Sequence, residues 1–265
     1  MWDERSGCLY LVDVTRGDVH RFDPRTGEAT TAAHVEGTVG AVAFTADGRL
    51  LLAAGTELVL DGSVLAHVED ADGVRFNDGA VDAAGRFWIG TMALDGSPGG
   101  GTLYRSDAGG MTPMLAPVSI SNGIDWSLDG TQMYYVDSTA QRIDVFAFDA
   151  ATGSISERRT FAEIDPVDGT PDGLTIDAEG HVWLALWEGW ALRRYRPDGT
   201  LERIVDLPVS RVTSCAFGGE DLHDLYVTSA NIGLSDAELR AQPHAGGLFV
   251  FRPGVAGRTP NRFAG

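Results

Sequence analysis

Lysine is absent from this chain, so all 20 of its basic side chains are arginine. They are outnumbered by 38 aspartate and glutamate residues, and the formal net charge is −18 at pH 7. A surface this acidic repels the phosphates of nucleic acids and of anionic membranes, so we expect neither as a partner. A GC-rich coding sequence would explain the missing lysine, and a surface adapted to high salt is the alternative.

Cysteine is also scarce, since the sequence contains only Cys8 and Cys215. Two cysteines form no disulfide framework, which favours a reducing compartment, so we expect a cytoplasmic location. No run approaches the roughly 18 apolar residues of a membrane-spanning helix, and the first residues, MWDERSG, have no basic or apolar signal region. The six histidines lack ligand spacing, and G-x-S-x-G, P-loop and H-E-x-x-H motifs are missing.

A repeat is the strongest signal that the sequence does contain. A turn with Asp or Gly, followed by a strand-like run, occurs six times at intervals of 41, 37, 45, 50 and 44 residues, and a second hairpin follows each copy. Strand repeats of roughly 40–50 residues are typical of propeller blades, each a four-stranded sheet. We therefore predict an all-β, six-bladed β-propeller, in a single domain over residues 1–265, with one short helix over 235–242. The six copies span 3–13, 45–55, 82–92, 127–138, 177–186 and 218–230.

The fold predicts where polar residues should gather. The innermost strands of a propeller run the same way along the central channel, so the residues before them form a ring at one mouth. Oxygen ligands without nearby cysteine or histidine favour a hard divalent cation there, in a central metal channel. Each Asn-Gly or Asp-Gly pair alone is typical of a tight turn, but three in one register favour a metal or substrate site. The expected inner strands start at Gly40, Gly79, Gly123, Gly173 and Cys215, directly after Val39, Asp78, Asn122, Asp172 and Ser214, with Asn77 one step further out.

Three other features are candidates for substrate contacts. Arg75 offers a rigid fork for an oxyanion or carboxylate, although an ordinary ion pair would also explain it. Asp95 lies in the Gly-rich loop ALDGSPGGG, which would act as a mobile lip, and a solvated loop acid is the alternative. Trp187, Glu188 and Trp190 follow a strand and would either wall a sugar pocket or pack between blades.

The chain resembles the gluconolactonase/regucalcin family, also called senescence marker protein-like, over nearly its whole length. The resemblance implies a six-bladed propeller that holds one divalent metal, such as Ca, Mg, Mn or Zn, and hydrolyses sugar lactones. It assigns Asn122 and Asp172 as metal ligands and Arg75, Asn77 and Asp95 as substrate contacts, and Asp172 is also the candidate catalytic base. The matching segments are RFNDGAVDAAGRFWIGTM, SNGIDWSLDGTQMYYVDS, TPDGLTIDAEGHVWLALW and RVTSCAFGGEDLHDLYVTSA.

One departure from the family concerns the N-terminus. The third metal ligand of the family is a Glu in a segment like E-x-P-x-W, and Trp2 matches the Trp of that segment. The Glu would then precede residue 1, and we expect the N-terminal closing strand to be missing with it.

Two other functions remain open on this sequence. A related six-bladed propeller with a calcium site would hydrolyse phosphotriesters, and a non-catalytic calcium-binding propeller would need no complete catalytic site. The expected partner is a small-molecule sugar lactone. The identity of the sugar and of the metal, and assembly into a homo-oligomer, are left open.

Overall fold

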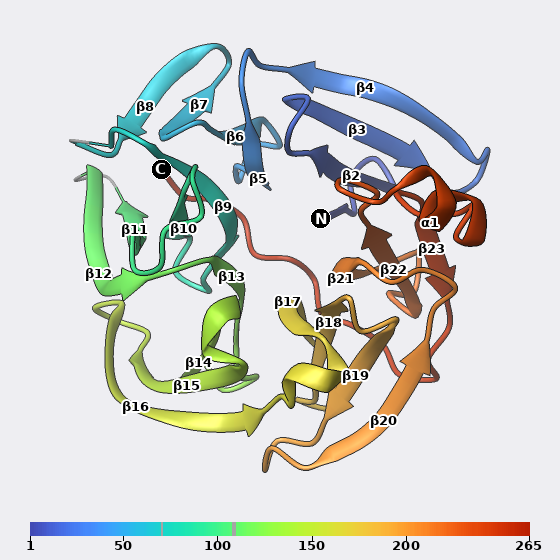
Figure 1. The fold of residues 1–265 in the computed structure, drawn as a ribbon. Helices are drawn as coiled ribbons and strands as arrows, with labels where there is room; N and C mark the ends of the chain where they lie inside the picture. The colour runs from blue at the N-terminus through green and yellow to red at the C-terminus, as the bar shows by residue number, and fades with distance from the viewer. Residues whose placement is uncertain (70, 108–109) are drawn as a thin grey trace. The chain divides into compact units, whose positions relative to one another are not determined.

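The computed structural model describes residues 1–69, 71–107 and 110–265, and nearly all of its regular structure is β-strand. The chain forms two compact units. The first contains residues 1–122, 148–155 and 259–265, and the second contains residues 123–147 and 156–258. Six small antiparallel sheets, coloured in chain order in Figure 1, agree with the six predicted repeats.

The first unit contains three four-stranded sheets in which neighbouring strands follow one another in the sequence. This meander order is what a chain of hairpins produces, because each short turn places the next strand beside the last. The strands are β1 (Trp2–Asp3), β2 (Cys8–Asp13), β3 (Asp18–Asp23), β4 (Glu28–His34), β5 (Val39–Phe44), β6 (Leu50–Ala54), β7 (Glu57–Leu60), β8 (Ser63–His67), β9 (Val74–Val81), β10 (Phe87–Ala93), β11 (Gly101–Asp107) and β12 (Gly110–Val118).

Most of the other three sheets belongs to the second unit. Two have four strands and the last, β21-β22-β23, has three, so the chain shows 23 strands in its described residues. The strands are β13 (Ser121–Trp126), β14 (Gln132–Asp137), β15 (Arg142–Asp149), β16 (Ser154–Glu163), β17 (Thr170–Ile176), β18 (Val182–Trp187), β19 (Ala191–Tyr195), β20 (Leu201–Asp206), β21 (Val212–Gly218), β22 (Asp224–Ser229) and β23 (Leu248–Phe251).

Helical structure is limited to three short segments of the described chain. The predicted helix is confirmed as α1 (Asp236–Ala241), and Ser235 and Glu238 form the expected capping box at its start. The two 3-10 helices are η1 (Ser138–Ala140) and η2 (Pro166–Asp168). No helix in the described part of the chain is long and apolar enough to cross a membrane.

A buried aspartate organises the first turn of two of the repeats. Asp82 accepts bonds from the backbone N–H groups of Ala84 and Arg86, at 2.9 and 3.1 Å, and from the indole Nε1 of Trp88, at 3.0 Å. Asp177 makes the same three kinds of bond six residues ahead of Trp183. Both carboxylates are fully buried, so these bonds replace the water that each would otherwise hold. The repeated D-x-x-G signal is therefore a clamp between a turn and the strand that follows it.

The last residues of the chain pack into the first unit. Phe263 is 4% exposed within an apolar cluster that includes Leu51, Phe76 and Phe87. Its N–H donates to the carbonyl of Phe44 at 2.8 Å, so the tail is bonded to β5 as well as buried. Burial of an aromatic side chain of this size contributes about 1.5–3 kcal/mol, which holds the tail on the unit.

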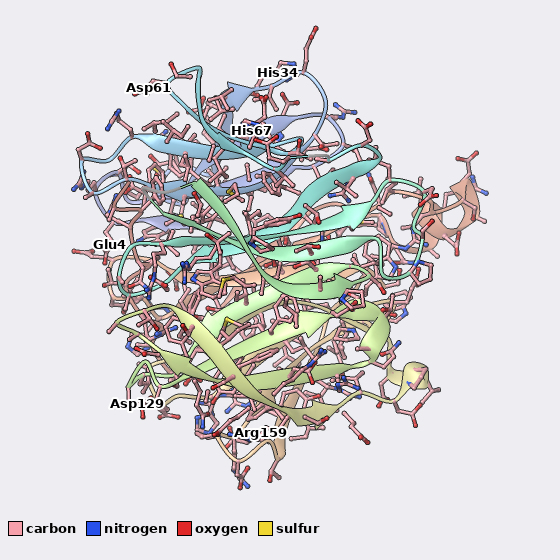
Figure 2. All side chains as sticks on the ribbon, turned by 90° about the vertical axis from the view of Figure 1, so that its left-hand side faces the viewer. Glu4, His34, Asp61, His67, Asp129 and Arg159 are labelled. Carbon is pink, nitrogen blue, oxygen red and sulfur yellow. The ribbon has the colours of Figure 1, made fainter. Side chains whose placement is uncertain are left out.

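We predict that Asp82→Ala destabilises the protein by about 3–5 kcal/mol, because it leaves the Arg86 guanidinium without its buried partner. The side chain of Arg86 is 11% exposed and lies 2.6 Å from Asp82. Urea unfolding monitored by tryptophan fluorescence measures the change. Asp129→Ala is the control, since Asp129 lies at an exposed hairpin tip (Figure 2) and should shift the midpoint far less. Equal shifts for the two variants would contradict the clamp.

Candidate active site

The first strands of four sheets change register near their N-terminal ends. In β9, Asn77 and Asp78 lie together opposite the single residue Gly90 of β10. In β17, Asp172 and Gly173 lie opposite Ala185 of β18. Two residues against one is the pattern of a β-bulge, which re-aims side chains and is common beside active sites. Similar shifts occur in β5 and β21.

The bulges correct two sequence-based expectations. The first strands were expected to begin at the glycine after each Asn or Asp, but β9 begins at Val74 and β17 at Thr170, so the candidate residues lie inside the strands. The alternative reading of these glycines as tight turns is also wrong. A Cβ on Gly123 would lie 2.5 Å from the backbone N of Leu174 and 2.8 Å from the carbonyl oxygen of Asp172. Glycine is required there because the neighbouring strand approaches too closely for any side chain.

A chain of hydrogen bonds joins three polar candidates in the first unit. Arg75 donates through NH1 to Oδ1 of Asn77 at 2.8 Å and to the carbonyl of Phe76 at 2.8 Å. Asn77 in turn donates through Nδ2 to Oδ1 of Asn122 at 3.0 Å and to the carbonyl of Ser121 at 2.7 Å. These partners fix the orientation of the Asn77 amide, because its oxygen faces a donor and its nitrogen faces two acceptors. We expected Asn122 directly before its inner strand and Asn77 one residue further from the start of its own strand, yet the two side chains are in contact.

The polar groups of this cluster are buried in part, since Arg75 and Asn77 are intermediate in exposure and Asn122 is buried. Asn122 is 7% exposed, so its amide oxygen accepts from Asn77 in a dry environment. Burial lowers the pKa of Arg75, since desolvation penalises the charged guanidinium. Beside them, burial raises the pKa of Asp78 to about 6, although a bond from the Gly79 N–H works in the opposite direction. The site thus contains a desolvated cation and a carboxyl group that titrates near neutrality.

Asp172 belongs to the second unit, where two contacts hold the backbone that leads to it. The hydroxyl of Ser138, from η1, donates to the carbonyl of Pro171 at 2.7 Å. On the loop that precedes β17, Asp168 forms a 2.8 Å ion pair with Arg193, whose side chain is 10% exposed. The Asp172 side chain itself is half-buried. Asp172 thus lies on a bulge, and a buried hydroxyl and an ion pair fix the backbone just before it.

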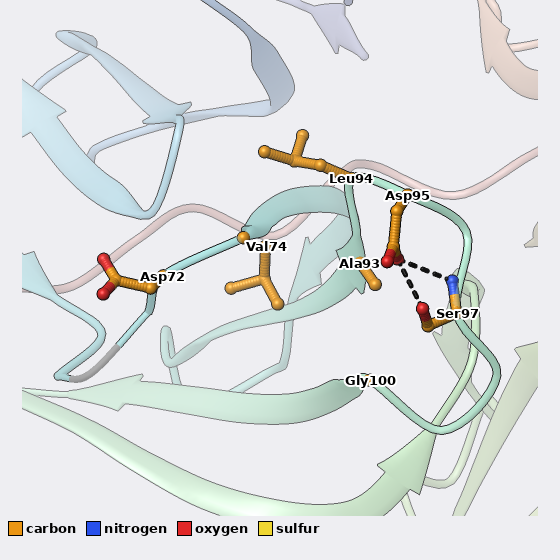
Figure 3. Close-up of a pocket in the computed structure, with 8 residues that line it drawn as sticks. Asp72, Val74, Ala93, Leu94, Asp95, Ser97 and Gly100 are labelled. Atoms are coloured by element: carbon orange, nitrogen blue, oxygen red, sulfur yellow. Dashed lines mark hydrogen bonds between the residues drawn. The ribbon is translucent and has the colours of Figure 1, made fainter.

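Asp95 lies in a separate pocket of about 370 Å³ in the first unit (Figure 3). Its carboxylate accepts from the N–H and hydroxyl of Ser97, at 2.9 and 2.6 Å, and these bonds lower its pKa. The pocket sits where Val74 pairs with Ala93, one residue along from Arg75. Arg75 is not among the described residues that line it, so the structure brings together Arg75, Asn77 and Asn122 but leaves Asp95 in a neighbouring hollow. The lining residues are Asp72, Gly73, Val74, Ala93, Leu94, Asp95, Ser97 and Gly100.

The residues that the family resemblance assigns as metal ligands are Asn122, in the first unit, and Asp172, in the second. Across the described residues there is no group of three or more His, Cys, Asp or Glu side chains placed to bind one. An amide oxygen and a carboxylate suit Ca²⁺ or Mg²⁺, and Mg²⁺ commonly keeps several waters beside one or two protein ligands. An amide oxygen that accepts one hydrogen bond has a second lone pair, so the bond from Asn77 is compatible with a metal at Asn122. The donor set fits a hard cation and fits zinc less well, since zinc prefers nitrogen and sulfur.

Two supporting residues were missed in the sequence. Ser121 accepts from Asn77 through its backbone carbonyl, which no side-chain pattern reveals. Ser138 lies in the segment VDSTAQ, 33 residues from the carbonyl that it binds, and nothing in that segment signals a long-range bond. Of the other residues expected in the polar ring, Val39 is buried and apolar, and the Ser214 side chain packs beside Gly173.

Comparison with known proteins identifies a family and several relatives of this chain. A family model described as "SMP-30/Gluconolactonase/LRE-like region" matches residues 1–231. Regucalcin from Xenopus laevis is 39% identical, over 100% of this chain and 93% of that protein. A Bacillus subtilis (strain 168) protein named "Putative sugar lactone lactonase YvrE" is 34% identical, over 100% of this chain and 94% of that protein.

A solved structure extends the similarity to three dimensions. The crystal structure of a calcium-binding protein, regucalcin, from Agrobacterium tumefaciens str. C58 matches with a TM-score of 0.94 at 32% identity. The match covers 99% of this chain and 92% of that chain. The predicted six-bladed β-propeller is thereby confirmed as the fold.

We predict that Asp78→Asn changes how stability depends on pH. The pKa of this acid is raised from 3.8 to about 6 in the folded state, so its ionisation opposes folding. The penalty is absent below pH 3.8, grows as the pH rises, and is complete above about pH 6. The parent should therefore lose up to about 3 kcal/mol relative to Asp78→Asn over that range. Urea unfolding of both proteins at pH 4 and pH 7.5 measures the difference, and parallel pH profiles would contradict it.

Proposed function

We propose that this chain, which belongs to the SMP-30/Gluconolactonase/LRE-like family, hydrolyses the ester bond of sugar lactones with the help of a divalent metal ion. Family membership and the relative named as a sugar lactone lactonase support the reaction class. The observation that carries the proposal is the hydrogen-bonded chain from Arg75 through Asn77 to Asn122. Through Asn77, the partly buried Arg75 is linked to Asn122, and the family resemblance assigns these residues to the substrate and the metal.

The base in this reaction is proposed to be Asp172. Hydrolysis forms a bond between a water oxygen and the lactone carbonyl carbon and breaks the bond from that carbon to the ring oxygen. The attacking water gives up a proton, which the Asp172 carboxylate accepts, and the ring oxygen leaves as a hydroxyl group after taking up a proton. A carboxylate held on a bulge, with its backbone fixed by Ser138, is positioned for this transfer without needing to reorganise.

Arg75 and Asn77 are proposed to orient the lactone and to stabilise negative charge on its oxygens. NH1 of Arg75 is engaged by Asn77 and by the Phe76 carbonyl, so the plane of the guanidinium is fixed before substrate arrives. Its Nε and NH2 carry further N–H donors that can face an oxyanion. Because burial has removed much of the competing water, each such bond is stronger than it would be at the surface.

Asn122 and Asp172 would hold the metal ion. When bound, such an ion polarises the ester carbonyl and makes a neighbouring water more acidic. The calcium-binding relative supports a hard cation, and the oxygen donors of these two residues agree with it. Asn77 contributes by holding the Asn122 oxygen in place through its 3.0 Å bond.

A titration assay tests the reaction class. Release of acid from D-glucono-δ-lactone and a pentonolactone would be followed in a pH-stat, in calcium or manganese buffers and after EDTA, with a phosphofluoridate as the competing substrate. Lactone turnover that is lost with EDTA supports the proposal. Turnover of the phosphofluoridate alone would make the protein a phosphotriesterase, and calcium binding without turnover of either compound would make it a non-catalytic propeller.

We predict that Asp172→Asn lowers kcat for the lactone by about 10²–10⁴-fold, since it removes the proposed base and one ligand charge. The fold should persist, because asparagine preserves the shape of the side chain. Initial rates and thermal melts measure both effects. Asp198→Asn, in an exposed hairpin turn of the same unit, is the matched control. A kcat within a few-fold of the parent would show that Asp172 is not the base.

We predict that Arg75→Ala lowers kcat/KM by about 10²–10³-fold while bound metal is retained, because Arg75 stabilises charge but ligates nothing. Metal content after gel filtration, together with steady-state kinetics, separates the two properties. Arg16→Ala provides a control, since that side chain is 78% exposed. Loss of metal in Arg75→Ala would assign the residue to the metal site instead.

A further inference from the structure

The last residue of β18 and the turn to β19, residues 187–190, lie at the same end of the second unit as Asp172. Trp187 pairs with Thr170, two residues before Asp172 on the neighbouring strand. At about 3.3 Å per residue along a strand, that offset is about 7 Å. A sugar ring held at Asp172 would therefore leave this turn within reach of a second ring attached to the first.

The backbone of the turn is strained at two residues. Glu188 and Trp190 adopt left-handed conformations, with φ of 59° and 57°. Glycine is the usual residue in this region, and a bulky aromatic residue there is an outlier. The Trp190 side chain is nevertheless 45% exposed, so it covers little of the core in return. Strain of this kind persists where the surrounding structure enforces it, and it concentrates at ligand-binding sites.

Arg211 ties the turn to its surroundings. Its guanidinium stacks on the Trp187 ring, 4.9 Å from the centroid, and its Nε donates to the Glu188 carboxylate at 2.6 Å. Its NH1 also donates to the backbone carbonyl of Ile232, on the loop that leads to α1. The Trp190 backbone is held as well, since its N–H donates to the Ser210 carbonyl at 3.2 Å. An exposed indole and a charged, hydrogen-bonding pair are thus presented together on a fixed backbone.

We propose that this turn binds a second sugar ring of the substrate, so that the preferred substrates are disaccharide lactones. The inference rests on the proposed lactonase function. The face of a pyranose that carries its C–H bonds fits against the indole of Trp190, whose ring face is electron-rich. Glu188 accepts and Arg211 donates, so together they match vicinal hydroxyl groups. An acyl chain in place of the second sugar would cover this ion pair, in which the Glu188 side chain is 47% exposed, without forming hydrogen bonds to it.

The test compares lactones that differ only in the second ring. The values of kcat/KM for cellobionolactone and maltobionolactone would be divided by that for D-glucono-δ-lactone, in the parent, Trp190→Gly, Trp190→Phe and Leu128→Ala. Glycine suits the backbone at position 190, so Trp190→Gly removes the indole without adding strain. Leu128 is also exposed, at 52%, but lies on the hairpin tip after β13, in a different sheet of the unit.

For at least one disaccharide lactone, we expect the parent to have a higher kcat/KM than for D-glucono-δ-lactone, so that the ratio of the two values exceeds one. In Trp190→Gly this ratio should be about 3–10-fold lower, which is the range of a single aromatic contact. Phenylalanine should restore most of the ratio, Leu128→Ala should not change it, and the Trp190→Gly melting temperature should not fall. Parent ratios below one for both disaccharide lactones, or an unchanged ratio in Trp190→Gly, would overturn the second-ring site and leave the lactonase proposal standing.

A binding measurement separates this site from catalysis. Methyl β-cellobioside and methyl β-maltoside contain no lactone, so their binding, followed by isothermal titration calorimetry, does not depend on turnover. Binding to the parent that weakens about 3–10-fold in Trp190→Gly supports the second-ring site even if glucono-δ-lactone is not hydrolysed, in which case only the lactonase proposal fails. Equal affinity of the two proteins, or no binding to either, would overturn the second-ring site.

Discussion

The β-bulge near the start of the first strands is the feature on which the rest of this site depends. A regular strand would point Asn77 and Asp78 to opposite faces of the sheet, and likewise Asp172 and its neighbour. The bulges place two residues against one and re-aim these side chains. They also demand glycine nearby, because adjacent backbones come within van der Waals distance, as at Gly123. The Asn-Gly and Asp-Gly pairs in the sequence follow from this crowding.

Burial then determines the chemistry of the polar groups. Asn77 donates to the Asn122 oxygen, and Arg75 is held by the Asn77 amide oxygen and a carbonyl oxygen, with no carboxylate partner among the described residues. A guanidinium that is not neutralised by an acid keeps its field available for a substrate oxyanion. In a chain with a net charge of −18, most other arginines pair with acids, as Arg86 does with Asp82. This contrast supports the proposed role of Arg75 as a substrate contact.

The sequence predicted the repeat period, the turns and the helix cap, because each of these depends on residues close together in the chain. The six repeats, the strand-rich composition and the capping box of α1 are all of this kind. The register of Asn77 against Asn122 was not predictable, since a bulge slips the strand by one residue and depends on the neighbouring strand. Asp95 was expected at a mobile lip, and the structure adds that its carboxylate bonds to Ser97 of the same loop and lines a pocket beside the cluster. The left-handed Trp190 had no sequence signal, because its conformation is imposed by contacts with the segment around Ser210.

The central proposal is that Asn122 and Asp172 are ligands of one hard cation and that Arg75 and Asn77 contact the substrate. The most direct measurement is an anomalous difference map from crystals of the protein soaked in manganese chloride. We predict one strong peak per chain, at about 2.1–2.5 Å from both the Asn122 amide oxygen and the Asp172 carboxylate. A map without a peak at these residues, or with its only strong peak elsewhere, such as beside Asp72 and Asp95, would contradict the claim.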